Sequence, residues 1–69
     1  MFVEMDGPEV TRLREEFSLS KKALAEAATV TQATVGRAER SRRVYPATAE
    51  LIAEALGADP RTLAHRQRS

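Results

Sequence analysis

The stretch that decides the fold runs from Ser20 to Glu39 and reads SKKALAEAATVTQATVGRAE. Its main apolar residues fall into two groups at helical spacing, Leu24, Ala25 and Ala28 and then Val35 and Ala38. Spacings of three and four residues place side chains on one face of a helix. We therefore predict a helix from Lys21 to about Ala28 and a second from Gln32 to about Arg40, with Thr29 to Thr31 as a tight turn.

Hydroxyl side chains precede both predicted helices. Ser20 stands directly before the first and Thr31 directly before the second. Such residues accept a hydrogen bond from a backbone N–H that the first turn of a helix leaves without a partner. Val30 is the one apolar residue of the turn, and we expect it to fill the angle between the two helices.

Three further helices are predicted around this pair. One begins at Asp6-Gly7-Pro8, where a cap precedes a proline that suits the first helical turn, and runs to about Phe17. Its inner face is expected to carry Val10, Leu13 and Phe17. Another runs from Pro46 to Leu56 and is ended by Gly57. A short helix follows Asp59-Pro60, with Leu63 facing inward.

Short connections link these five helices and leave no room for a strand. Apolar and polar residues with β-branched content never alternate for long, apart from a weak Val44-Tyr45. We therefore predict an all-α domain over residues 7–65, with a short N-terminal tail at residues 1–6 and a basic C-terminal tail at residues 66–69. The pattern leaves open whether Phe2 and Val3 cover part of the core or stay disordered.

The composition excludes several classes of protein. The 69 residues include no cysteine and a single histidine, His65, so neither a disulfide nor an ordinary zinc site is expected. No serine has a histidine in a catalytic pattern, no glycine-rich phosphate loop is present, and Glu15 and Glu16 point to different faces of one helix. We predict neither an enzyme nor a need for a cofactor or metal.

Charge is distributed unevenly along the chain. The formal net charge is +1. Residues 1–20 carry −3, from five acids and two bases, whereas residues 21–69 carry +4, from nine bases and five acids. Such asymmetry hints at contact with nucleic acid. No apolar run approaches the about 20 residues of a membrane span, and acids stand where a signal peptide carries bases. We expect a cytoplasmic protein associated with the nucleoid.

The motif and its surroundings resemble the Cro/repressor class of helix-turn-helix proteins, also called the Xre type. The resemblance covers about Val10 to Leu63 and rests on LSKKALA at Leu19–Ala25, VTQATV at Val30–Val35, RAER at Arg37–Arg40 and AEALG at Ala53–Gly57. It implies a compact five-helix, lambda-repressor-like fold that binds double-stranded DNA. Two positions depart from the usual pattern, because Thr29 and Arg40-Ser41 stand where the class often has glycine.

Members of this class lay the second motif helix in the major groove, with its N-terminal residues against base edges. The resemblance therefore assigns base contacts to Gln32, Ala33, Thr34 and Arg37. A glutamine can pair with N6 and N7 of adenine, an arginine with O6 and N7 of guanine, and an alanine can touch a thymine methyl. Phosphate contacts are assigned to Lys21, Lys22, Thr31, Arg40, Arg42 and Arg43.

The same resemblance implies an ion pair between Arg14 on the first helix and Glu39 at the end of the third. Simpler interpretations of the other residues stay open. Gln32 and Thr34 could be ordinary solvated residues, and Arg37 could pair with Glu26 or Glu39. The arginines after the third helix could form a solvated loop. Tyr45 could pack beside the following proline or contact a base or phosphate.

The function implied by the resemblance is sequence-specific transcriptional regulation, expected to be repression by a phage or prophage protein. One such domain recognises few base pairs, so we expect a homodimer on a pseudo-palindromic site. The helix after Asp59-Pro60, with Leu63 and the basic tail, is the expected dimer surface. The alternative is a small helix-turn-helix protein that acts mainly through a protein partner, as an antitoxin or an adaptor.

Overall fold

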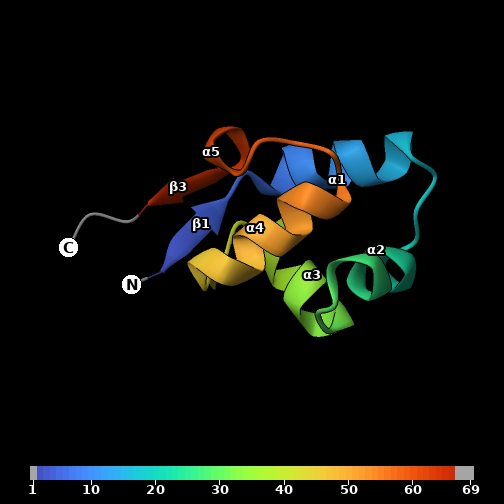
Figure 1. The fold of residues 1–69 in the computed structure, drawn as a ribbon, viewed down its shortest axis with the longest axis horizontal. Coiled ribbons are helices and arrows are strands. Elements are labelled where there is room, and N and C mark those ends of the chain that lie inside the picture. Colours follow the sequence, from blue (N-terminus) through green and yellow to red (C-terminus); the bar gives the residue numbers. More distant parts are fainter. Residues whose placement is uncertain (1, 67–69) are drawn as a thin grey trace.

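The fold is known from a computed structural model, which describes the backbone of residues 2–66 and the side chains of residues 2–64. The described chain forms five helices: α1 (Gly7–Glu16), α2 (Lys21–Ala28), α3 (Gln32–Glu39), α4 (Pro46–Ala55) and α5 (Pro60–Leu63). It also forms three short strands: β1 (Val3–Met5), β2 (Arg43–Val44) and β3 (Ala64–Arg66). Figure 1 shows β1 and β3 at one end of the molecule and α2 at the other.

The five predicted helices are confirmed, and the caps explain where each begins. Asp6, Ser20, Thr31 and Asp59 each accept a hydrogen bond from a backbone N–H in the first turn of the helix that follows. Prolines occupy the first turns of α1, α4 and α5, where the missing N–H removes no helical hydrogen bond. None of the described helices is long and apolar enough to cross a membrane.

A three-stranded antiparallel sheet is the main difference from the sequence-based prediction. The central strand β1 pairs Val3 with Val44 of β2 and Met5 with Ala64 of β3. The expectation of a strand-free domain is therefore wrong. So is the expectation of a tail at residues 1–6, because Val3 and Met5 are buried in the core. The expected C-terminal tail is described only at Arg66, which lies in β3; residues 67–69 lie outside the described part.

The core is small and aliphatic, and α2, α3 and α4 supply most of it. Its larger fully buried side chains are Met5, Val10, Leu24, Val35, Ile52, Leu56 and Leu63. One expectation fails, because Phe17 is 54% exposed: it caps the end of α1, and the chain turns away at Ser18 with φ 57°. Leu63 faces inward as predicted, and at 1% exposure its side chain is not available to a second chain. The rest of the expected dimer surface stays a prediction.

Helices α1 to α4 all end in the same backbone motif. One residue takes a left-handed conformation, and two backbone N–H groups bond back to the last helical carbonyls. The left-handed residues are Ser18, Thr29, Ser41 and Gly57, with φ of 57°, 61°, 56° and 66°. After α2, Val30 N–H donates to Ala25 O and Thr29 N–H to Glu26 O. This Schellman motif favours glycine, yet glycine occupies only the position after α4.

Thr29→Gly should stabilise the domain. A left-handed conformation costs a residue with a Cβ about 1–2 kcal/mol, and glycine recovers part of this against its larger chain entropy. The balance of these two effects is a net gain of about 1 kcal/mol, so the melting temperature by circular dichroism should be roughly 4–8 °C higher. Thr29→Ala retains the Cβ and should gain less. A Thr29→Gly protein that melts at or below the parent temperature would contradict this account.

Candidate nucleic-acid interface

The outward face of α3 and the start of α2 enclose a shallow depression of about 440 Å³. Its lining comes from three adjacent segments: Lys21 on α2, then Gln32, Ala33, Gly36 and Arg37 on α3, and Arg40 and Arg42 beyond it. Gln32, Ala33 and Arg37 are exposed, whereas Thr34 is half-buried. The structure therefore gathers three of the four expected base-contacting residues on one surface with three of the expected phosphate contacts.

The start of α3 is fixed by two threonine hydroxyls. Thr31 Oγ1 accepts a hydrogen bond from Thr34 N–H at 3.1 Å and lies 2.9 Å from Thr34 Oγ1. The Thr31 hydroxyl therefore caps the helix, and the Thr34 hydroxyl hydrogen-bonds to it. This makes them part of the support for Gln32 and Ala33, which lie between them and project into solvent.

Arginines surround the C-terminal half of α3. Arg42 and Arg43 line a second depression, of about 470 Å³, together with Arg37, Ser41 and Glu4. All of the lysines and arginines assigned to phosphate are exposed. Arg37 makes no ion pair within the described residues, so the alternative in which it pairs with Glu26 or Glu39 is not observed. Its guanidinium is available to an external anion or base.

A nearly buried ion pair joins α3 to α1. Arg14 Nε donates to Glu39 Oε2 at 2.6 Å, and the two side chains are only 13% and 8% exposed. Arg14 Nη1 also donates to Leu19 O at 2.8 Å, and Thr11 Oγ1 donates to Glu39 Oε1 at 3.0 Å. Both carboxylate oxygens thus have a partner, and the end of α3 is held against α1.

A second link between α1 and α3 lies at Gly7. Its N–H donates to Ser41 Oγ at 3.0 Å. A Cβ at Gly7 would meet the Glu39 carbonyl oxygen and lie 2.7 Å from the carbonyl carbon. Ser41, which stands where the class often has glycine, takes the left-handed conformation and also provides this hydrogen bond. Sequence reasoning missed Thr11, Gly7 and Ser41, because their partners lie 28 to 34 residues away and no local pattern marks them.

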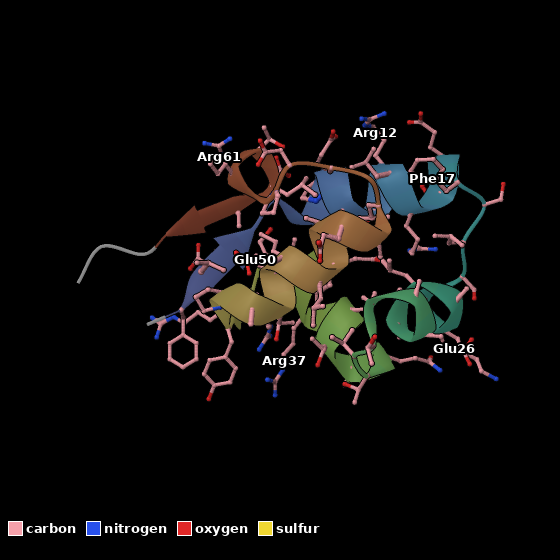
Figure 2. The ribbon with its side chains drawn as sticks, viewed as in Figure 1. Arg12, Phe17, Glu26, Arg37, Glu50 and Arg61 are labelled. Carbon is pink, nitrogen blue, oxygen red and sulfur yellow. The ribbon has the colours of Figure 1, made fainter. Side chains whose placement is uncertain are left out.

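The acidic first helix neutralises its charge away from α3. Arg12 hydrogen-bonds Glu9 and pairs with Glu16 at 2.8 Å, and its hydrogen bond lowers the pKa of Glu9. At α5, hydrogen bonds from the backbone and side chain of Arg61 lower the pKa of Asp59. Figure 2 shows Arg12 and Arg37 on opposite sides of the molecule. Among the described residues, the basic side chains of the candidate interface form no ion pair, whereas Glu9 and Glu16 on α1 pair with Arg12 on the other side of the molecule.

The exposed face of α3 matches the chemistry of a DNA-binding surface. Amide and guanidinium groups suited to base edges lie within a border of cations suited to phosphates. No cluster of three metal-ligating side chains occurs among the described residues. The arrangement can bind and orient an anion.

Comparison with known proteins identifies the family. The model of the helix-turn-helix family matches residues 10–63. The crystal structure of the restriction-modification controller protein C.AhdI from Aeromonas hydrophila matches with a TM-score of 0.73 and 32% sequence identity, over 81% of this chain and 86% of that chain. No curated protein matches the sequence. The chain is therefore a DNA-binding transcriptional regulator that belongs to the helix-turn-helix family, of the Cro/repressor type.

Proposed function

We propose that the protein is a sequence-specific regulator that reads the major groove of duplex DNA with α3. The observation that carries the proposal is the depression shared by Gln32 and Arg37, with Lys21, Arg40 and Arg42 at its border. A helix inserted into the groove would bring the amide and the guanidinium to base edges. The bordering cations would reach the backbone on either side and fix the orientation of the helix.

Gln32→Ala and Arg37→Ala should weaken binding to the specific site while leaving the fold intact. Each variant should lose about 1–3 kcal/mol on the specific duplex and relax the preference at one base pair of each half-site. Both side chains are exposed, so the melting temperature should stay near that of the parent. Fluorescence anisotropy with the specific duplex and single-base variants of it measures both effects. Unchanged discrimination in both variants would overturn the assignment of α3.

Lys21→Ala should weaken binding to all duplexes alike. The loss of one phosphate contact releases one counterion fewer, so the slope of log K against log salt should fall by about one unit. Arg61→Ala is the matched control, because it removes the same charge from α5, where Arg61 is 91% exposed and pairs with Asp59. Its slope should equal the parent slope. If both variants shift the slope equally, net charge rather than a specific phosphate contact explains the effect.

We propose that the regulator works as a homodimer on a pseudo-palindromic site and as a repressor where that site overlaps a promoter. Leu63 is buried, whereas Leu51 on α4 is a large aliphatic side chain that is 39% exposed. Leu51→Glu should therefore weaken self-association in sedimentation equilibrium. Transcription from a template that carries the selected site should fall as protein is added; a rise would identify an activator instead.

The likeness to C.AhdI supports a second candidate, control of restriction and modification genes. At 32% identity over most of both chains, the shared fold makes such genes the first place to look for the selected site. A site upstream of unrelated genes would argue against this candidate. A different result is an affinity for duplex DNA that stays constant as salt is raised, while the protein forms a stable complex with another protein. That result would favour action through a protein partner.

A further inference from the structure

We propose that the outer face of the β1–β2 pair, formed by Phe2, Arg43 and Tyr45, is a second DNA-contacting surface. It would hold the sugar-phosphate backbone beside the base pairs that α3 reads. This inference rests on the proposed function of α3, because it places the backbone relative to that helix. It adds Phe2 and Tyr45 to Arg43, which the family resemblance already assigns to phosphate.

The pairing of the two strands creates this face. Val3 and Val44 stand opposite each other and are buried. Successive side chains of a strand point to opposite faces, so the neighbours of the two valines project away from the core. Phe2 and Tyr45 meet there, with ring centroids 5.2 Å apart and an angle of 31° between the ring planes. Their exposed fractions of 39% and 65% are high for large aromatic residues.

The aromatic pair is continuous with the proposed DNA-reading surface. A depression of about 370 Å³ is lined by Thr34 and Arg37 of α3, Arg43, Tyr45 and Phe2 of the sheet region, and Thr48 of α4. Arg37 also lines the depression over α3 and the one beside Arg42. It is therefore the point at which the three depressions join. A duplex seated on α3 would pass its backbone next to the aromatic pair.

The chemistry of this face favours a sugar-phosphate backbone over another occupant. Two guanidinium groups, at Arg37 and Arg43, border the rings, and neither makes an ion pair within the described residues. Glu4 stands opposite Arg43 in the ladder and lines the neighbouring depression, but no carboxylate of the described residues lines the depression that holds the rings. This lining favours an occupant that is anionic and also offers apolar surface to the rings, as phosphates and deoxyriboses do together. The Tyr45 hydroxyl can donate to a phosphate oxygen. A second copy of the chain would bring like charges together here.

The experiment compares Tyr45→Phe and Tyr45→Ala on two duplexes. The long duplex extends beyond the selected site on both sides, and the short one ends at the base pairs that α3 covers. Tyr45→Phe retains the ring against Phe2 and removes only the hydroxyl, so it should fold like the parent. It should bind the long duplex about tenfold more weakly, since a hydrogen bond to a charged group is lost. On the short duplex, parent and variant should bind equally.

Ethylation interference provides the second readout. If Tyr45 only supported the fold beside the sheet, the set of phosphates whose ethylation blocks binding would not change. A flanking phosphate whose ethylation blocks the parent protein should become neutral for Tyr45→Phe. Phe17→Ala is the control, since it removes an exposed aromatic residue from the end of α1, and its affinity should equal that of the parent.

Each outcome decides the proposal. The parent and both Tyr45 variants could bind the long duplex equally while Arg37→Ala still binds it more weakly. This result would overturn the present inference and leave the role of α3 standing. If neither Arg37→Ala nor the Tyr45 variants lose affinity, the proposed function fails together with this inference.

Discussion

Arg14→Ala should leave a large fraction of the protein unfolded. The substitution removes the guanidinium that neutralises Glu39 and leaves a carboxylate of 8% exposure with Thr11 as its remaining side-chain partner. Removing one member of a buried pair costs about 3–5 kcal/mol, because the remaining charge is uncompensated. A domain of this size has about 3–5 kcal/mol of stability from its core. The loss is therefore comparable with the whole free energy of unfolding.

Thermal unfolding followed by circular dichroism measures this effect. Arg12→Ala is the matched control, because Arg12 lies on the same helix but makes its ion pairs in solvent, where such pairs contribute little. It should melt near the parent temperature. A double variant in which methionine replaces both Arg14 and Glu39 should recover much of the stability, because no charge is left buried. An Arg14→Ala protein that melts like the parent and only binds DNA more weakly would contradict a structural role for the pair.

Gly7→Ala should be the other strongly destabilising substitution. The new Cβ would meet the Glu39 carbonyl group and lie 2.8 Å from Ser41 Oγ. Overpacking usually costs about 1–3 kcal/mol. Here the obstacle is backbone, which cannot rotate away, so we expect a loss at or above the upper end of that range. The hydrogen bond from Gly7 N–H to Ser41 Oγ should be lost as α1 moves aside.

Gly36→Ala is the matched control for this prediction and should have the opposite sign. Nothing lies within 4 Å of a Cβ at Gly36, and alanine is favoured over glycine within a helix by about 1 kcal/mol. Its melting temperature should rise, whereas that of Gly7→Ala should fall sharply. A Gly7→Ala protein as stable as the parent would show that α1 and α3 do not approach as closely as described.

These two predictions concern one feature, the attachment of α3 to α1. The ion pair holds the C-terminal end of α3 from one side, and the Gly7–Ser41 contact holds the turn that follows it. Neither contact uses the side chain of Gln32 or Arg37. The scaffold therefore fixes the angle of α3, while the residues on its outer face remain available for DNA.

The helices could be predicted from the sequence because their signals are local. Ser20 and Thr31 cap helices that begin at the next residue, and the apolar spacing marks the inner faces. The strands could not be predicted, since β1, β2 and β3 contain two or three residues each. Alternation over such a length is indistinguishable from chance, and the pairing of Val3 with Val44 depends on the tertiary fold.

The candidate site was only partly predictable for the same reason. Gln32 and Arg37 follow from the position of the motif, and the pairing of Arg14 with Glu39 came from the family resemblance. The support from Thr11 and Ser41, and the approach of Tyr45 to Arg37, arise from segments that meet only in the folded chain. Thr29 is the opposite case, because a local signal marks it. It stands where the class often has glycine, a residue that accepts positive φ, so its left-handed conformation could be anticipated from its position in the motif.

Selection of bound sequences from random duplex DNA tests the central claim, that α3 reads bases, most directly. It should be run in parallel with the parent protein, Gln32→Ala and Arg37→Ala. The parent should enrich a pseudo-palindrome with half-sites about one helical turn, roughly 10 base pairs, apart. Each variant should enrich the same site with the preference lost at one base pair of each half. Enrichment of an identical site by all three proteins, or of none by the parent, would contradict the claim.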